Sequence, residues 1–399
     1  MLSRWAALAV FFAGLGIAIS GVTPLPASHF SLPDPQMAAP EAQAAAALPN
    51  RFEWSDLPHP THSAHAVTVA EILPGPNAPG QPVRLLAAWF GGSREGAADV
   101  SLYQSEWART GQSESWAPAR EMLNRTDAER QLGRNIRKLG NPLLITAPGQ
   151  LQLYFVSVSY GGWAGSAINR SFSTDDGATW SPARRLITSP FFNLSTLVRN
   201  PGVFYTDGSL GLPVYHEFIS KHGEWLHLSA DGRVLGKSRL SMPRPTLQPA
   251  VVALTEQHAV AALRDSGPGE NQVQWSESTD GGQSWAQKSA RAIPNPNSAV
   301  AMIGLRDGTL LMACNPIPGN RNQLSLLRST DQGDTWSLVR VVESSPDDRE
   351  EFSYPALLQD HQGMIHLLYT WKRRGIRHAR FSQAWLNHPG APTVPAVPR

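Results

Sequence analysis

The sequence repeats one short pattern, S-T-D-x-G-x-[TS]-W, three times: STDDGATW at 173–180, STDGGQSW at 278–285 and STDQGDTW at 329–336. This pattern is typical of a tight hairpin. The Asp accepts backbone N–H bonds across the turn, the Gly supplies a positive φ, and the Trp packs back under the hairpin. We therefore interpret these boxes as scaffold and expect Trp180, Trp285 and Trp336 to be buried in equivalent outer hairpins.

The spacing of the boxes predicts the architecture. The second and third boxes are about 51 residues apart, and the first and second are about twice as far apart. A degenerate copy, SADG, lies at 229–232 near the midpoint of the longer interval. Trp116, in SESWAP, belongs to another degenerate box. A period of this size indicates propeller blades. Dividing residues 51–385 by a blade of about 50 residues predicts an all-β, six-bladed β-propeller, with seven blades the less favoured count.

The strand pattern agrees with this prediction. Runs such as LQLYFVSVS (151–159) and TLLMACN (309–315) are short, rich in branched and aromatic residues, and bounded by Gly, Asp or Pro. The chain of 399 residues also holds 33 Gly, 33 Pro and 13 Trp, which favours many turns and an aromatic surface suited to sugars. A β-sandwich or a β-helix explains the box period less well.

Composition excludes several function classes. A net charge of +2 with 17% charged residues includes no basic stripe, so we expect no nucleic-acid partner. The single cysteine, Cys314, excludes an internal disulfide and is expected to be a buried thiol. The 12 histidines show no H-x-x-x-H or H-E-x-x-H pattern, so we predict no metal and no cofactor. The oligomeric state is not predicted.

The N-terminus predicts export. Arg4 precedes an apolar stretch from Trp5 to Val22, whose length lies between a signal-peptide core and a short membrane span. Residues 1–22 are thus a signal peptide or a membrane anchor, residues 23–50 a Pro/Ala-rich linker, and residues 386–399 a disordered tail. We expect the globular part in the periplasm or at the cell surface, with an inner-membrane tether if the segment is not cleaved.

The boxes resemble the Asp-boxes, or BNR repeats, of the sialidase superfamily, and the resemblance covers nearly all of the globular chain. It implies a six-bladed propeller with an acidic-sugar site at its centre. Such enzymes hold the sugar carboxylate with three arginines, attack with a tyrosine assisted by a glutamate, and use an aspartate as acid–base. Because the box also occurs in non-enzymatic propellers, it does not establish activity.

Carrying the resemblance over assigns three residues. Tyr354, in FSYPAL, is similar to the nucleophile, while Arg264, in ALRD, and Arg321, ahead of the third box, match the second and third arginines. The warrant for the arginines is bidentate pairing of a guanidinium with a carboxylate. These residues lie in different predicted blades, so we expect their side-chain tips to meet in the central funnel.

Two positions depart from the resemblance. His65 stands where the first arginine is expected, and Gln248, which cannot take a proton, stands where the assisting glutamate is expected. Glu351 and Glu217 are other available carboxylates. On a regular strand, Glu351 would face away from Tyr354 because side chains alternate.

Further candidates have both structural and functional interpretations. Glu95 and Asp99 lie where the acid–base residue is expected, though a turn-forming Asp explains the same position. Arg137, beside Lys138 and Asn141, is a candidate for the missing arginine or part of a solvated face. A Tyr215/His216 pair beside Glu217 could move protons, or His216 could be a satisfied core histidine. Asn297, in NPNS, is first a turn residue and second a ligand contact.

Three function hypotheses follow. The first is an exo-glycosidase for an acidic sugar, with Arg264, Arg321, Tyr354 and Glu95 or Asp99 in the roles above. The second is a uronate-glycan lyase in which the Tyr215/His216 pair moves the protons. The third is a non-catalytic glycan-binding propeller. In each case the partner is a glycan that carries an acidic sugar.

Overall fold

The computed structural model of the protein describes residues 28–32, 43, 45, 47–73, 81–110, 113–189, 193–241, 244–269, 271–289 and 291–388. The predicted export segment, residues 1–22, and all but the start of the predicted tail lie outside these residues. No helix within the described part of the chain is long and apolar enough to cross a membrane.

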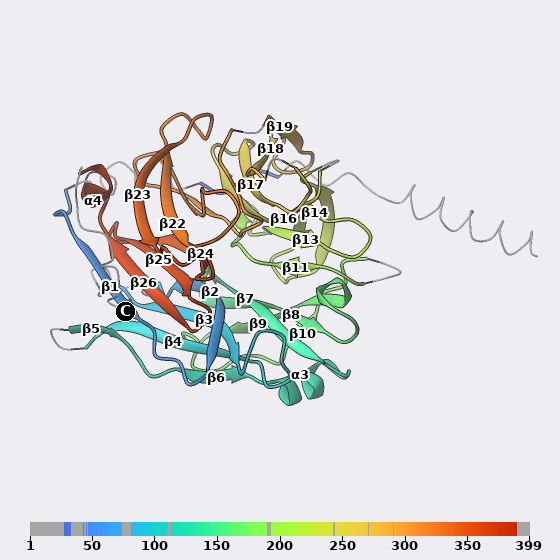
Figure 1. The fold of residues 1–399 in the computed structure, drawn as a ribbon. Helices are drawn as coiled ribbons and strands as arrows, with labels where there is room; N and C mark the ends of the chain where they lie inside the picture. Colours follow the sequence, from blue (N-terminus) through green and yellow to red (C-terminus); the bar gives the residue numbers. More distant parts are fainter. Residues whose placement is uncertain are drawn as a thin grey trace, which may run out of the picture.

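The described residues form six antiparallel sheets, which we number as blades in chain order and which surround a common axis (Figure 1). Blade 1 contains β2 (Ser63–Glu71), β3 (Leu85–Gly92), β4 (Ser101–Thr110) and β5 (Ser113–Trp116), with β6 (Arg120–Leu123) beside β4. Blade 2 contains β7 (Lys138–Ala147), β8 (Gln150–Val158), β9 (Ser166–Ser173) and β10 (Arg184–Arg185). Blade 3 contains β11 (Leu197–Val198), β13 (Leu210–His216), β14 (His222–Leu228) and β15 (Val234–Arg239), with β12 (Val203–Phe204) beside β13.

The remaining blades follow the same order from the axis outward. Blade 4 contains β16 (Thr246–Ala253), β17 (Ala259–Asp265), β18 (Gln274–Ser278) and β19 (Ala286–Lys288). Blade 5 contains β20 (Ala301–Gly304), β21 (Leu310–Cys314), β22 (Gln323–Ser329) and β23 (Ser337–Ser344). Blade 6 contains β24 (Phe352–Gln359), β25 (Ile365–Trp371), β26 (Gly375–Phe381) and β1 (Phe52–Asp56). The prediction of an all-β, six-bladed propeller is confirmed.

The N-terminal strand closes the ring. β1 pairs antiparallel with β26, from Phe52 opposite Phe381 to Asp56 opposite Arg377, so the first strand completes the last blade. From residue 47 onward, helical structure in the described residues is limited to α3 (Arg125–Leu132), the 3-10 turn η1 (Trp163–Gly165) and α4 (Gln383–Asn387). The two ends of the propeller are thereby joined by backbone hydrogen bonds, with β1 as the outer strand of blade 6.

The three boxes have the same internal geometry. In the first, Ser173 Oγ donates to Asp175 Oδ1 at 2.7 Å and accepts from the Gly177 N–H at 2.8 Å, while the Thr179 N–H donates to Asp175 at 2.8 Å. The boxes that begin at Ser278 and Ser329 repeat these bonds. The interpretation of the boxes as hairpin scaffold therefore agrees with the structure.

The box tryptophans are half-buried, which corrects the expectation that they are buried. Each lies at the seam with the preceding blade. Trp285 packs against Trp225 of β14 with ring centres 5.6 Å apart, and Trp336 packs against Trp275 of β18 at the same separation. Trp180 donates to Gln104 Oε1 of β4 at 2.8 Å. A seam exposes one side of the ring, so partial burial follows from this position.

Part of the predicted linker lies against the propeller. Phe30 is fully buried and stacks on Tyr205, with ring centres 5.0 Å apart. Its N–H donates to the carbonyl of Glu256, in the turn between β16 and β17. Gln248 and Arg264 stand at the other end of these two strands. The segment 28–32 therefore docks on the face opposite the strand ends that carry them.

Two consecutive residues after β11 cross-link the blades at the axis. Arg199 donates to the carbonyls of Val67 (2.9 Å) in blade 1 and of Tyr354 (2.6 Å) and Pro355 (2.9 Å) in blade 6. The amide of Asn200 donates to Gln248 and Pro249 of blade 4, at 3.2 and 3.0 Å, and to Val300 beside blade 5 at 3.2 Å. Blade 3 is thereby tied to blades 1, 4, 5 and 6.

We predict that Asn200→Ala lowers the free energy of unfolding by about 2–4 kcal/mol, because it leaves buried carbonyls without their donor. Gln287→Ala, on the exposed outer strand β19, is the matched control and should change stability by less than about 0.5 kcal/mol. Urea unfolding followed by tryptophan fluorescence measures both. Equal midpoints for the two variants would contradict the cross-linking role.

Candidate functional site

A residue in the left-handed region of φ stands at or near the start of every inner strand, and we call the group of side chains that gathers there around Tyr354 the funnel. The φ values lie between 43° and 61° at Ala66, Asn141, Ser195, Gln248, Asn297 and Tyr354, one in each blade. In β2, β7, β16 and β24 the strand register also shifts at this residue, as in a β-bulge. A bulge interrupts the alternation of side chains and redirects them locally. Near the centre, Arg264 contacts Asn297, Gln248 and Tyr354. Asn141 and Gln248 both contact the hydroxyl of Tyr215.

Arg264, Arg321 and Tyr354 lie together, as the sequence analysis expected. Arg264 Nη1 donates to Tyr354 Oη at 3.4 Å and to Gln248 Oε1 at 3.0 Å, and its Nε donates to Asn297 Oδ1 at 2.7 Å. Arg321 Nη2 donates to the carbonyl of Asn297 at 2.6 Å. The guanidinium carbon of Arg321 is 5.9 Å from the centre of the Tyr354 ring. The two arginines thus flank the phenol from blades 4 and 5.

Glu351 also lies in this group, so the expectation that it faces away from Tyr354 is wrong. The bulge between Ser353 and Ala356 breaks the strict alternation on which that expectation rested. Glu351 Oε1 accepts from Arg321 Nη1 at 3.2 Å, and Oε2 accepts from Arg373 Nε at 2.8 Å. Burial opposes its ionisation, but the charges of Arg321 and His65, the hydrogen bond from the Ser353 hydroxyl and the charge of Arg373 bring the pKa of Glu351 down to about 2. It is therefore ionised near neutral pH and bridges two guanidinium groups.

Sequence reasoning missed Arg373. It stands in the turn between β25 and β26, where Lys372 and Arg373 both have positive φ, at 52° and 56°. Two consecutive residues with positive φ are typical of a tight hairpin turn. The run WKRRG between two apolar strands was the available signal, because it ends a blade-6 hairpin on the side where β24 begins.

His65 occupies the wall beside Tyr354. Its ring is 2% exposed and meets the Tyr354 ring edge-on, with centres 4.4 Å apart. Its Nε2 is 3.8 Å from Glu95 Oε2, and neither ring nitrogen has a hydrogen-bond partner among the described residues. Burial lowers the pKa of His65 to about 3, despite the opposing charge of Glu351. The imidazole is therefore neutral under ordinary conditions.

The two carboxylates of the β3–β4 loop lie in different surroundings. Glu95 approaches the funnel, with Oε2 3.6 Å from Arg373 Nη1 in addition to its contact with His65. Asp99 is exposed and accepts from the backbone N–H of Ser93 at 2.9 Å and from its hydroxyl at 3.0 Å. The bonds of Asp99 close its own loop, so the structural interpretation fits Asp99, and Glu95 remains a candidate for proton transfer.

The expected Tyr215/His216 pair is separated by the structure. Tyr215 is buried, and its hydroxyl accepts from Asn141 Nδ2 at 2.9 Å and from Gln248 Nε2 at 3.4 Å. His216 packs beside His222 of the neighbouring strand, with ring centres 4.9 Å apart. Adjacent residues of a strand point to opposite faces, so the two side chains cannot act on one substrate atom. Burial raises the pKa of Tyr215, which suits a fixed hydrogen-bonding role.

Glu217 and Lys138 complete the polar groups. Burial raises the pKa of Glu217, although the charges of Lys221, Arg264 and Lys138 oppose the shift. Lys138 lies 4.2 Å above the Trp163 ring, and its charge acts on both Glu95 and Glu217. Arg137 is exposed and is not one of the two arginines that Glu351 bridges. Those two are Arg321 and Arg373. Within the described residues, no group of three or more His, Cys, Asp or Glu side chains is placed to hold a metal ion.

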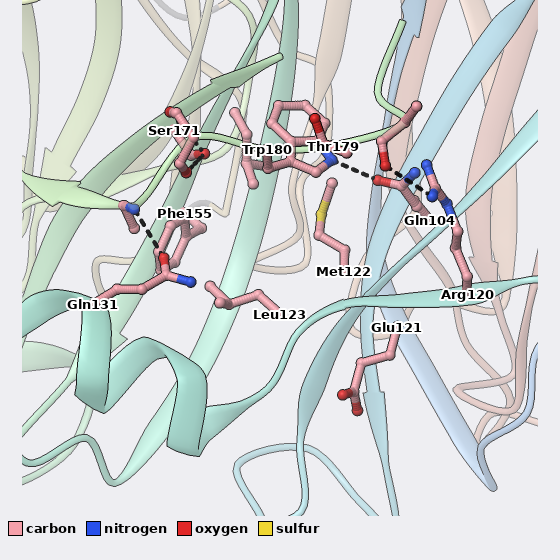
Figure 2. A pocket seen from close by; sticks show the side chains of 14 residues that line it. Gln104, Arg120, Glu121, Met122, Leu123, Gln131, Phe155, Ser171, Thr179 and Trp180 are labelled. Atoms are coloured by element: carbon pink, nitrogen blue, oxygen red, sulfur yellow. Dashed lines mark hydrogen bonds between the residues drawn. The ribbon is translucent and has the colours of Figure 1, made fainter. Parts of the chain in front are cut away.

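A separate cavity of about 180 Å³ lies at the outer side of blades 1 and 2, beside α3 (Figure 2). Phe155 and Trp180 contribute to its apolar walls. In Figure 2, the indole N–H of Trp180 donates to Gln104, and Gln131 accepts from the N–H of Ala183 at 2.8 Å. These bonds hold the first box and the segment after it in place. The cavity therefore belongs to the scaffold, and the ionisable groups described above gather in the funnel.

Six antiparallel sheets of four or five strands around an axis, Asp-box hairpins at the rim and arginines around a tyrosine define a sialidase-like propeller. Residues 83–367 match the family described as BNR repeat-like domain. The chain therefore belongs to the BNR repeat-like domain family.

Known relatives are similar in fold and distant in sequence. A sialidase of Micromonospora viridifaciens is 31% identical over 131 residues, which are 30% of this chain and only 19% of that protein. A Hadza microbial sialidase, Hz136, superposes with a TM-score of 0.64 at 16% identity, covering 81% of this chain and 66% of the other. The NanB sialidase of Streptococcus pneumoniae gives 0.63 at 11% identity, covering 86% and 73%. At these identities, the two superpositions show the shared fold.

We predict that Arg264→Ala weakens binding of an acidic monosaccharide by about tenfold or more. Its hydrogen bonds to Asn297, Gln248 and Tyr354 go to neutral groups, and a charge-assisted bond to a ligand carboxylate is worth about 1.5–3 kcal/mol. Arg233→Ala is the matched control. Arg233 directly follows the degenerate box at 229–232, and its side chain is 81% exposed. Isothermal titration with the same sugar measures both variants, and equal affinities would refute the assignment of Arg264 to the ligand site.

Proposed function

We propose that this protein binds the acidic sugar at the end of a glycan in its funnel and cleaves the glycosidic bond of that sugar. The convergence of Arg264 and Arg321 on Tyr354 carries the proposal. Planar guanidinium groups pair with carboxylates in a bidentate manner, and two of them fix the orientation of a sugar ring. The phenol of Tyr354 then stands beside the bound ring as the nucleophile.

The reaction needs proton carriers. In the first step, the Tyr354 oxygen bonds to the anomeric carbon, the bond to the leaving oxygen breaks, and the leaving oxygen takes a proton. Glu217, whose pKa is raised by burial, is suited to donate that proton. Gln248 cannot accept the phenolic proton, so we assign that step to Glu95, which lies beside the His65 ring that packs on Tyr354. Water then releases the sugar from the tyrosine.

The relatives support an acidic sugar as the ligand. Both structural relatives and the Micromonospora protein are named sialidases, and sialic acid is an acidic sugar. This chain aligns with 19% of the Micromonospora protein, and it has His65 and Gln248 at two positions that the resemblance would fill differently. We therefore propose the class of acidic sugars rather than one member of it.

A uronate-glycan lyase is the second candidate. One observation favours it. The neutral imidazole of His65 packs on Tyr354, and Gln248 stands where the resemblance would place a carboxylate base. In such a reaction the arginines would neutralise the uronate carboxylate, a base would remove the adjacent carbon-bound proton, and the leaving oxygen would depart. No water enters the products.

Product mass separates these reactions. We predict that the purified protein, incubated with a panel of acidic oligosaccharides, releases an acidic monosaccharide with the mass of one added water. Tyr354→Phe should retain sugar binding and lose turnover by at least about a thousandfold, since removing a nucleophile abolishes the covalent step. Tyr103→Phe, in blade 1, is the control and should retain activity.

The other outcomes each decide against the hydrolase. Products without added water, carrying a new double bond, would establish the lyase. Binding without any product would establish a glycan-binding propeller. Full activity in Tyr354→Phe would exclude that residue as the nucleophile.

We also propose that the propeller is exported and reaches the periplasm or the cell surface, through residues 1–22 as signal peptide or membrane anchor. The apolar run from Trp5 to Val22 supports this proposal. Docking of Phe30 opposite the funnel is compatible with a tether that leaves the funnel open.

Fusing the first 50 residues to a reporter that is active only after export should give signal, because the apolar run directs translocation. A fusion with Arg residues at two central positions of the run is the control and should give none. Equal signals from the two fusions, or a reporter confined to the cytoplasm, would contradict export.

A further inference from the structure

Arg199 is a buried cation on the propeller axis. The residue is 2% exposed. Its side chain extends from the end of β11 to backbone carbonyls of the inner strands β2 in blade 1 and β24 in blade 6. Its guanidinium carbon is 5.6 Å from the centre of the Tyr354 ring. It therefore lies beneath the floor of the funnel and away from solvent.

The charge of Arg199 has no anionic partner in the described part of the chain. Its three hydrogen bonds go to neutral carbonyl oxygens of Val67, Tyr354 and Pro355. The ionisable groups that act on it are the phenols of Tyr354 and Tyr215, and burial lowers the pKa of Arg199 to about 10. Burying a charge without a counter-charge costs several kcal/mol in proteins. An anion beside this side chain would remove most of that cost.

One N–H of Arg199 remains available. Its Nε is buried and has no hydrogen-bond partner among the described residues. Arg199 also lines a small cavity of about 20 Å³ together with Thr68, Asn200, Ala301 and Leu357, and this cavity opens toward the exposed Pro201. The Thr68 hydroxyl accepts the N–H of Leu144 at 3.1 Å and can donate its own proton to a ligand. The cavity thus combines a fixed positive charge with donors.

We propose that this axial cavity binds one small monovalent anion, chloride under physiological conditions, as the counter-ion of Arg199. The volume admits a single water-sized particle, since about 10–15 Å³ is the minimum for one. It excludes sulfate, phosphate and organic acids. Water would fit the volume but would leave the charge of Arg199 uncompensated. The ligand is distinct from the glycan, because the cavity lies below the strand starts that form the funnel.

Thermal unfolding in different salts tests the proposal. At constant ionic strength, replacing sodium gluconate by sodium chloride should raise Tm along a saturating curve by about 3–6 °C, since the anion binds only the folded protein. Bromide should act similarly. Arg199→Gln should abolish the difference between the salts. Arg349→Gln removes the same charge from a side chain that is 90% exposed and should retain the difference.

A second measurement serves if Arg199→Gln fails to fold. Crystals of the unaltered protein soaked in bromide should show an anomalous peak within about 3.5 Å of Arg199 Nε, the distance expected for an N–H to halide contact. Identical Tm values in chloride and gluconate, or a bromide soak with no peak on the axis, would overturn the proposal. Neither result would bear on whether the funnel cleaves an acidic sugar.

Discussion

The left-handed residue at the start of each inner strand is the constraint on which the centre of the molecule depends. One such residue stands in every blade, and in four blades it coincides with a register shift. Side chains of a regular strand alternate between two faces, and the bulges at Gln248 and Tyr354 interrupt that alternation. Both side chains contact Arg264, as does Asn297 from the segment before β20.

This geometry determines the electrostatics of the funnel. Arg264 contacts neutral partners, whereas Arg321 and Arg373 share Glu351, and Arg199 contributes a buried positive charge below the floor. Cations outnumber the ionised carboxylates that bind them, so the funnel floor favours an anion. Hydrogen bonds to Asn297 and Gln248 hold Arg264 before a ligand arrives, and such preorganisation lowers the conformational cost of binding.

The sequence predicted the features that repeat. The boxes fixed the blade number, because a hairpin that needs Asp, Gly and Trp at set positions leaves a recognisable spacing. Arg264, Arg321 and Tyr354 were found through a resemblance to known enzymes. Glu351 was misplaced because a bulge cannot be read from strand alternation, and the pairing of Tyr215 with His216 failed for the opposite reason, since there the alternation holds. Arg373 and Arg199 were missed because their roles depend on contacts with distant blades.

A crystal structure of the unaltered protein with an acidic monosaccharide tests the central claim most directly. The account predicts the sugar carboxylate between Arg264 and Arg321, with oxygen to nitrogen distances of about 2.7–3.0 Å, and the anomeric carbon facing Tyr354 Oη. A sugar bound at another surface, or one bound in the funnel with its carboxylate turned toward solvent, would contradict it.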